Sequence, residues 1–217
     1  MASEMSSREE ILRRVRAATG GASTEEAASI AWNELPRHYK RDGVRRREQV
    51  LELFEDRLRD YDATVVRCGR GDVSTNVAKM LLERGKRRLV VPSGVTPEWL
   101  PADFEFDVDS DFTATELDRY EGVLTGSTVA IAETGTVILQ NVAGQGRRAV
   151  TLVPDYHLCL VRVEDVVETV PEAMDRLRPS SRLATTFVSG PSATADIEMT
   201  RIKGVHGPRY LDVILIA

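Results

Sequence analysis

Three short segments in the second half of the chain combine glycine with hydroxyl, carboxylate or imidazole side chains. The first, residues 127–137, places Glu133, Thr134, Gly135 and Thr136 between two apolar runs. A carboxylate at a strand end lies where α/β sheets gather their active sites. Glu133 could act there as a nucleophile or acid/base group, while the neighbouring hydroxyls and the glycine amide bind an oxyanion or a phosphate. The alternative is a plain hairpin whose turn uses glycine for a positive φ, and spacing alone does not choose between them.

The second segment, residues 189–198, directly follows a predicted strand. Gly190 begins a turn, Ser192 can cap the next element, and Asp196 and Glu198 place two acids within a short reach. Such a loop can hold an anion on its backbone amides. The alternative is an ordinary strand-to-helix turn with acids at the helix N-terminus. We favour a ligand-binding loop, because a turn alone needs little of this polarity.

The third segment, residues 201–209, contains His206 followed by Gly207. A histidine in such an open, glycine-rich setting can reach a ligand and titrate near neutrality, although a lone histidine is more often a loop hydrogen bonder. A further glycine-rich loop ends in Arg147 and Arg148, which could meet an anion, but it lacks the dinucleotide and P-loop patterns. No set of His, Cys, Asp and Glu has metal-ligand spacing, so the sequence predicts no dedicated metal site.

The elements that must position these segments are short apolar runs and amphipathic helices. Strands are predicted at 63–68, 88–92, 104–109, in five short runs between about 123 and 161 that include 149–153, at 185–189 and at 212–216; helices are predicted at 73–84 and 164–177. The strand–helix–strand order at the start of this series indicates a parallel pair. The sequence therefore predicts an α/β fold with a mixed, largely parallel sheet flanked by helices.

The first 60 residues have a different texture, with amphipathic helices predicted at 8–18 and around 50–58. We expect residues 1–60 to form an N-terminal helical appendage and residues 61–217 to form the α/β core. Six basic residues lie between Arg37 and Arg47. They form either an anionic docking patch or a solvated linker, and we favour the linker because twelve basic and twelve acidic residues balance over the whole appendage.

Composition narrows the classes of function. The 217 residues include 29 Lys and Arg against 34 Asp and Glu, a net charge of −5 that argues against a nucleic-acid-binding surface. Cys68 and Cys159 are the only cysteines, too few for an iron–sulfur cluster in the usual all-cysteine manner, and typical of reduced, buried thiols. The apolar stretches are far shorter than the ~20 residues of a membrane span. We therefore expect a cytoplasmic protein without a membrane span.

Taken in order, four segments resemble the LUD domain of the lactate-utilisation protein C family: residues 127–137, 144–148, 189–198 and 204–216. The resemblance covers roughly residues 60–217. It implies a core of the kind shared by glucosamine-6-phosphate deaminase, ribose-5-phosphate isomerase and CoA transferases. It also implies a role in oxidising L-lactate to pyruvate alongside two partner proteins that carry iron–sulfur clusters. The family's motif positions include Glu133, Thr134, Gly135, Thr136, Gly190, Ser192, Asp196, Glu198, His206 and Gly207.

Two hypotheses arise from these observations. In the first, the chain is the cluster-free component of a lactate-oxidising assembly: it binds no cofactor by itself, docks on the iron–sulfur subunits and binds a small carboxylate or phosphate-bearing ligand at the glycine-rich loops. In the second, it is a self-sufficient enzyme similar to a CoA transferase or a sugar-phosphate isomerase, with Glu133 as nucleophile or base.

Overall fold

The computed structural model describes residues 6–20, 24–195, 201–204 and 206–217, and the chain divides into two units, residues 1–39 and 40–217. In the first unit, α1 (Ser7–Ala18) begins with a capping box in which Ser6 and Glu9 exchange hydrogen bonds. The next helix, α2 (Glu25–Glu34), begins at Thr24, whose hydroxyl accepts from the backbone of Ala27. Neither of these two described helices buries a residue.

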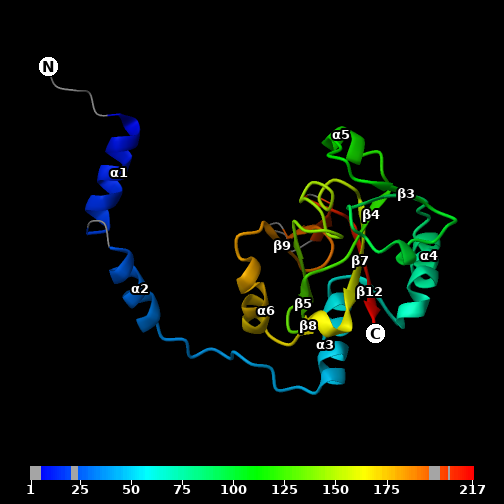
Figure 1. The fold of residues 1–217 in the computed structure, drawn as a ribbon, viewed down its shortest axis with the longest axis horizontal. Coiled ribbons are helices and arrows are strands. Elements are labelled where there is room, and N and C mark those ends of the chain that lie inside the picture. The colour runs from blue at the N-terminus through cyan, green and yellow to red at the C-terminus, as the bar shows by residue number, and fades with distance from the viewer. Residues whose placement is uncertain (1–5, 21–23, 196–200, 205) are drawn as a thin grey trace. The chain divides into compact units, whose positions relative to one another are not determined.

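Within the described part of the second unit, six parallel strands form the larger sheet in the order β1-β12-β7-β4-β2-β3 (Figure 1). Their bounds are β1 (Thr64–Cys68), β2 (Arg88–Val91), β3 (Glu105–Val108), β4 (Gly122–Thr125), β7 (Tyr156–Arg162) and β12 (Tyr210–Ile216). Every neighbouring pair is parallel. The inner strands are nearly continuous apolar runs because layers cover both faces of the sheet.

A smaller sheet has the order β8-β5-β6-β9. Its strands are β5 (Val129–Ile131), β6 (Thr136–Gln140), β8 (Val166–Val167) and β9 (Thr185–Val188), and a separate antiparallel pair joins β10 (Ala193–Ala195) to β11 (Arg201–Lys203). Pairs β5–β6 and β6–β9 are antiparallel, whereas β5–β8 is parallel. The prediction of an α/β fold is confirmed, but the mixed pairing belongs to this smaller sheet and the larger sheet is entirely parallel.

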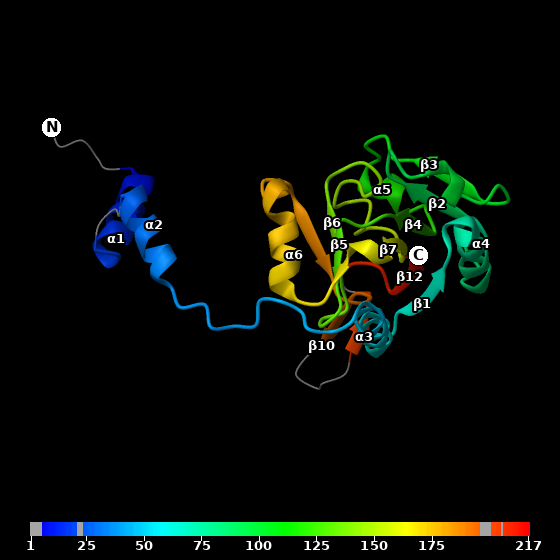
Figure 2. The same cartoon turned by 60° about the horizontal axis from the view of Figure 1, so that its bottom comes forward.

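Helices cover both faces of the larger sheet, and α4 and α6 lie on opposite sides of the core (Figures 1 and 2). The helices are α3 (Arg47–Asp60), α4 (Val73–Glu83), α5 (Ala114–Leu117) and α6 (Val170–Leu177), with 3-10 turns at Arg70–Asp72, Pro97–Trp99, Val163–Asp165 and Arg178–Ser180. Successive residues of the larger sheet's strands point to its two faces and so belong to two core clusters. One cluster includes side chains of α4, and the other includes side chains of α3 and of the smaller sheet. Among the described residues, no helix is long and apolar enough to cross a membrane.

Two predicted elements differ from the structure. Residues 149–153 form turns instead of a strand. The segment is apolar because its turns are packed against the core, where Val150 joins a cluster with Leu117 and Val123. The helix predicted at 164–177 is a 3-10 turn, then β8, then α6, which begins only after Thr169. Thr169 and Glu172 form the capping box that sets this start.

Helix α3 is grouped with the core by the structure, although the expected boundary at residue 60 placed it in the appendage. Its buried side chains, Val50, Leu51, Phe54 and Leu58, join the cluster formed by the larger and smaller sheets. The division of the structure therefore falls between Tyr39 and Lys40.

Candidate functional site

Glu133 lies in a four-residue turn between β5 and β6, whose register pairs Ile131 with Thr136. Gly135 has a φ of +59°, and a Cβ at this position would lie 2.8 Å from Cβ of Arg57 on α3, so the turn requires glycine. The segment therefore has the backbone of a hairpin. Its hydroxyls form a chain, with 2.7 Å between Oγ1 of Thr134 and Oγ1 of Thr136.

The Glu133 carboxylate belongs to an ion cluster. Nζ of Lys40 lies 2.6 Å from Oε1 of Glu133 and 2.7 Å from Oε1 of Glu168. Arg45 donates to the same Glu168 carboxylate through its guanidinium at 2.8 Å and its backbone N–H at 2.7 Å. Burial favours the protonated acid, but the hydrogen bonds from Lys40 and the backbone N–H groups outweigh it and lower the pKa of Glu168 to about 2. Glu168 is therefore ionised at neutral pH, and the hydrogen bonds to Glu133 and Glu168 raise the pKa of Lys40.

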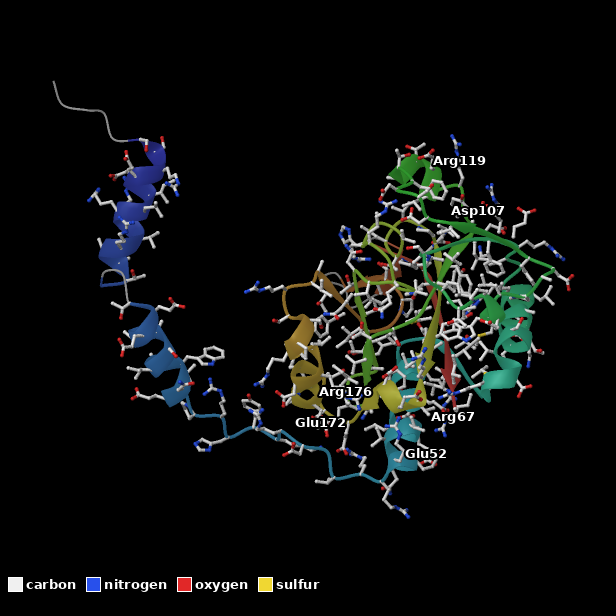
Figure 3. The ribbon with its side chains drawn as sticks, in the orientation of Figure 1. Glu52, Arg67, Asp107, Arg119, Glu172 and Arg176 are labelled. Atoms are coloured by element: carbon white, nitrogen blue, oxygen red, sulfur yellow. The ribbon has the colours of Figure 1, made fainter. Side chains whose placement is uncertain are left out.

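The basic segment 40–47 makes further contacts with the core. The backbone N–H of Gly43 donates to Glu172 at 3.0 Å, where α6 begins (Figure 3), and the guanidinium of Arg47 donates to the carbonyl of Val166 at 2.6 Å. These cations contact groups of their own chain. The interpretation of this segment as a solvated linker therefore missed its contacts with the core. Lys40 and Arg45 already form ion pairs with carboxylates of the same chain.

A pocket of about 300 Å³ brings together two of the three predicted segments. We call it the Arg148 pocket; it is lined by Arg148, Thr151, His157, residues 187–193, residues 206–208 and Leu211. The predicted ligand-binding residues Gly190, Ser192, His206 and Gly207 are all among them. Glu133, Thr134, Gly135 and Thr136 do not line it, although Oγ1 of Thr136 lies 2.7 Å from Oγ of the lining residue Ser189. Asp196 and Glu198 lie outside the described residues.

Ser192 joins the two loops of the pocket. Its backbone N–H donates to the carbonyl of Pro208 at 2.8 Å, its carbonyl accepts from the N–H of Gly204 at 2.9 Å, and its hydroxyl accepts from the N–H of His206 at 3.0 Å. Gly190 makes the turn with a φ of +87°, against Tyr61, where a Cβ would lie 2.5 Å from Cβ of the tyrosine. Segments separated in sequence therefore form one wall.

Arg148 is the arginine of this pocket; the residue is exposed, and its contact with Thr151 is partly buried. Its guanidinium donates to the Thr151 hydroxyl at 3.2 Å, and no described carboxylate lies within ion-pair distance of it. Burial lowers the pKa of Arg148, but a guanidinium keeps its charge at neutral pH. Its neighbour Arg147 pairs with both oxygens of Asp109 at 2.8 Å and so fixes the loop. The described lining residues include no carboxylate, and the pocket therefore favours an anion.

His157 forms the floor of the pocket and was missed as a site residue, because it stands inside an apolar run that predicts only a strand. It is 2% exposed, and its Nε2 lies 2.8 Å from the hydroxyl of Thr125 on the neighbouring strand β4. Burial, and then the charge of Arg148, lower the pKa of His157 to about 4. The ring is therefore neutral at pH 7. Its Nδ1 has no hydrogen-bond partner among the described residues, so it is open to a ligand.

The buried neutral His157 predicts a pH dependence of stability. Its pKa is about 4 in the folded state and 6.5 for a free side chain, so below pH 6.5 the unfolded chain binds more protons. Stability should therefore fall as the pH is lowered from 6.5 to 4, by up to about 3 kcal/mol from this residue. Urea unfolding across this range should show a shallower fall for His157→Gln, and equal slopes for the two proteins would contradict the assignment.

The two cysteines do not suit an iron–sulfur cluster. Both are free, Cys159 is buried beside Thr125, and burial raises the pKa of Cys159 to about 12, so it is a neutral thiol at pH 7. Burial also raises the pKa of Cys68. No group of three or more His, Cys, Asp and Glu side chains placed to hold a metal occurs among the residues that the structure describes.

Comparisons with known proteins agree on one family. The model of the LUD domain matches residues 22–216. Lactate utilization protein C of Deinococcus radiodurans is 43% identical over 173 residues, which cover 78% of this chain and 81% of that protein. Lactate utilization protein C of Bacillus subtilis is 31% identical over 180 residues, covering 76% and 72%. The crystal structure of a DUF162 family protein from Deinococcus radiodurans matches with a TM-score of 0.71 at 39% identity, covering 80% of this chain and all of that chain.

Proposed function

This chain belongs to the lactate utilisation protein C family of LUD-domain proteins, and from that premise we propose that it is the cluster-free component of a lactate-oxidising system. The family match confirms the resemblance seen in the four sequence segments. In this proposal the electrons of lactate oxidation pass through iron–sulfur partner subunits, because the two cysteines of this chain are too few for a cluster held by cysteines alone. The free thiols also favour a cytoplasmic location.

The single observation that carries the ligand proposal is Arg148, a cation without a described carboxylate partner in a pocket that has no acid among its described lining residues. A small carboxylate such as L-lactate or pyruvate can pair with the guanidinium. The open Nδ1 of neutral His157 can then hydrogen-bond a hydroxyl or carbonyl oxygen, since one ring nitrogen of a neutral imidazole donates and the other accepts. Hydroxyls of Ser189 and Ser192 supply further partners.

The alternative of an enzyme with Glu133 as nucleophile receives less support. Oε1 of Glu133 lies 2.6 Å from Nζ of Lys40, and the residue is not part of the Arg148 pocket. A covalent role would first require that ion pair to open. A core of the kind found in CoA transferases and sugar-phosphate isomerases stays part of our proposal, supported by the all-parallel sheet and the resemblance.

The ligand proposal predicts that Arg148→Gln weakens L-lactate or pyruvate binding by at least about tenfold, because it removes a charge-assisted hydrogen bond. Isothermal titration calorimetry on both ligands measures this effect. Arg119→Gln, on an exposed arginine beyond α5 (Figure 3), is the matched control and should bind normally. Equal affinities in the Arg148 variant and the wild type would contradict the proposal.

The partner proposal is tested in cells and with purified proteins. A deletion strain should lose growth on L-lactate, and wild type should restore it while Arg148→Gln should not. The purified chain should also associate with cluster-carrying proteins encoded beside its gene. Normal growth of the deletion strain together with no association would overturn the assignment.

A further inference from the structure

A second cavity, of about 210 Å³, lies at the carboxyl ends of the parallel strands. We call it the strand-end cavity; it is lined by Gly94, Thr96, Trp99, Gly126, Ser127, Ala143, Gly144, Gln145, Leu160 and Arg162. Arg162 is the last residue of β7, whereas His157 of the Arg148 pocket is its second residue. In a parallel sheet these positions lie towards opposite edges, so the two cavities are separate sites.

The chain paths around this cavity leave the sheet in opposite directions. After β2 the chain runs to the turn Pro97–Trp99, and Trp99 packs in the core cluster of α4. After the adjacent strand β4 it enters β5, whose Ala130 packs in the cluster of α3 on the other face. Adjacent parallel strands whose connections diverge leave a crevice outside their carboxyl ends, and open α/β sheets bind ligands at such a point.

The lining of the strand-end cavity suits an anion. Arg162 is the only charged side chain among its described lining residues, and no described carboxylate lies within ion-pair distance of it. Gly94 and Gly144 adopt φ values of +83° and +77°, and a Cβ on Gly94 would lie 2.7 Å from Cβ of Ala143. These glycines therefore let the two loops of the lining pack against each other, and the backbone N–H of Gly144 donates to the carbonyl of Ser93 at 2.7 Å.

Gln145 is another polar side chain in the lining of this cavity. The side chain is buried at 8% exposure, and its Oε1 accepts from the Thr128 hydroxyl at 2.8 Å and from the backbone N–H of Gln140 at 2.7 Å. The amide group is thereby fixed, and in the part of the chain that the structure describes its Nε2 has no acceptor. No buried side-chain nitrogen or oxygen among the described residues lacks a hydrogen-bond partner, so this Nε2 reaches solvent and can donate to a ligand in place of water.

We propose that the strand-end cavity binds the phosphate of an organic phosphate. The guanidinium of Arg162 pairs with the phosphate, the Gln145 amide donates to a second oxygen, and hydroxyls of Thr96 and Ser127 lie in the same lining. The described lining offers several hydrogen-bond donors and no acid. A phosphate, with three strong acceptor oxygens, suits such a lining better than a carboxylate, which has two. The indole of Trp99 forms the wall against which the organic part lies.

The experiment uses the full chain with Trp32→Phe, which leaves Trp99 as its one tryptophan. Titration with pyrophosphate and with adenosine diphosphate is followed by calorimetry and by Trp99 fluorescence. We expect saturable binding of both probes, a change in fluorescence, and affinity at least about tenfold weaker in Arg162→Gln. Arg148→Gln should bind both probes as the parent does. L-lactate, in contrast, should bind weakly to Arg148→Gln and normally to Arg162→Gln.

Each other outcome overturns the proposal. Absence of saturable binding at millimolar concentrations excludes a phosphate site. Binding that Arg148→Gln abolishes and Arg162→Gln leaves intact places the phosphate in the Arg148 pocket. Binding of pyrophosphate without adenosine diphosphate excludes an organic phosphate. The proposed function can fail independently, because its readout is L-lactate binding in Arg148→Gln.

Discussion

Replacing Phe54 by alanine is expected to lower the free energy of unfolding by about 3–5 kcal/mol, the usual cost of truncating a fully buried aromatic side chain. Phe54 is 0% exposed and contacts the cluster that α3 shares with the larger and smaller sheets. Its removal leaves a cavity between helix and sheet that neighbouring side chains cannot fully close. Chemical unfolding of the full chain, followed by circular dichroism, measures the loss.

The matched control is Ile30→Ala, which also truncates a large apolar side chain but at a position that is 54% exposed on α2. Its effect should stay within about 0.5 kcal/mol, as for other surface substitutions. Comparing the stabilities of the two variants tests whether α3, unlike α2, is part of the folded core. A loss below about 1 kcal/mol for Phe54→Ala would show that α3 does not belong to the core.

Replacing Asp212 by asparagine is expected to destabilise the protein by about 4 kcal/mol, because it leaves a partly buried arginine without its counter-charge. Asp212 is 1% exposed on β12, the second strand from one edge of the larger sheet. Its two carboxylate oxygens accept from the Arg84 guanidinium at 2.6 and 2.9 Å, and one also accepts from the Tyr156 hydroxyl at 3.0 Å. A thermal or urea unfolding curve at neutral pH measures the effect.

Asp107→Asn provides the control, since Asp107 pairs with Arg88 at 2.7 Å but both side chains are nearly half exposed. Water and salt screen such a pair, and its loss should cost far less than that of Asp212. Raising the salt concentration should weaken the Asp107 effect and leave the Asp212 effect nearly unchanged. Similar losses for the two variants would mean that burial does not set the strength of these pairs.

Local patterns predicted most strands of the core, because apolar runs such as 212–216 are buried on both faces. They did not predict that β5 and β6 belong to the smaller sheet, since strands of the two sheets have the same hydrophobic periodicity and the same kinds of residues. They also mistook residues 149–153 for a strand, because a buried turn residue such as Val150 carries the same apolar signal.

For the site, the glycine-containing loops were predictable because their turns need positive φ values, as at Gly190. Their grouping was not predictable. The Glu133 carboxylate is held by Lys40, 93 positions away, and only the folded topology makes that pair. His157 and Arg148 enter the pocket from a strand and a turn whose sequences give no sign that they share a ligand with Ser192.

The position of β12 has a consequence for how the protein is made. This strand lies between β1 and β7, pairing Thr64 with Asp212 across most of the chain. While the ribosome is still synthesising the earlier elements, β1 has no neighbour in the larger sheet, and the apolar faces of α3 and β1 lack the β12 side chains of their core cluster. The sheet can close only once the chain has been synthesised through Ile216, so nascent chains must be kept from aggregating until then.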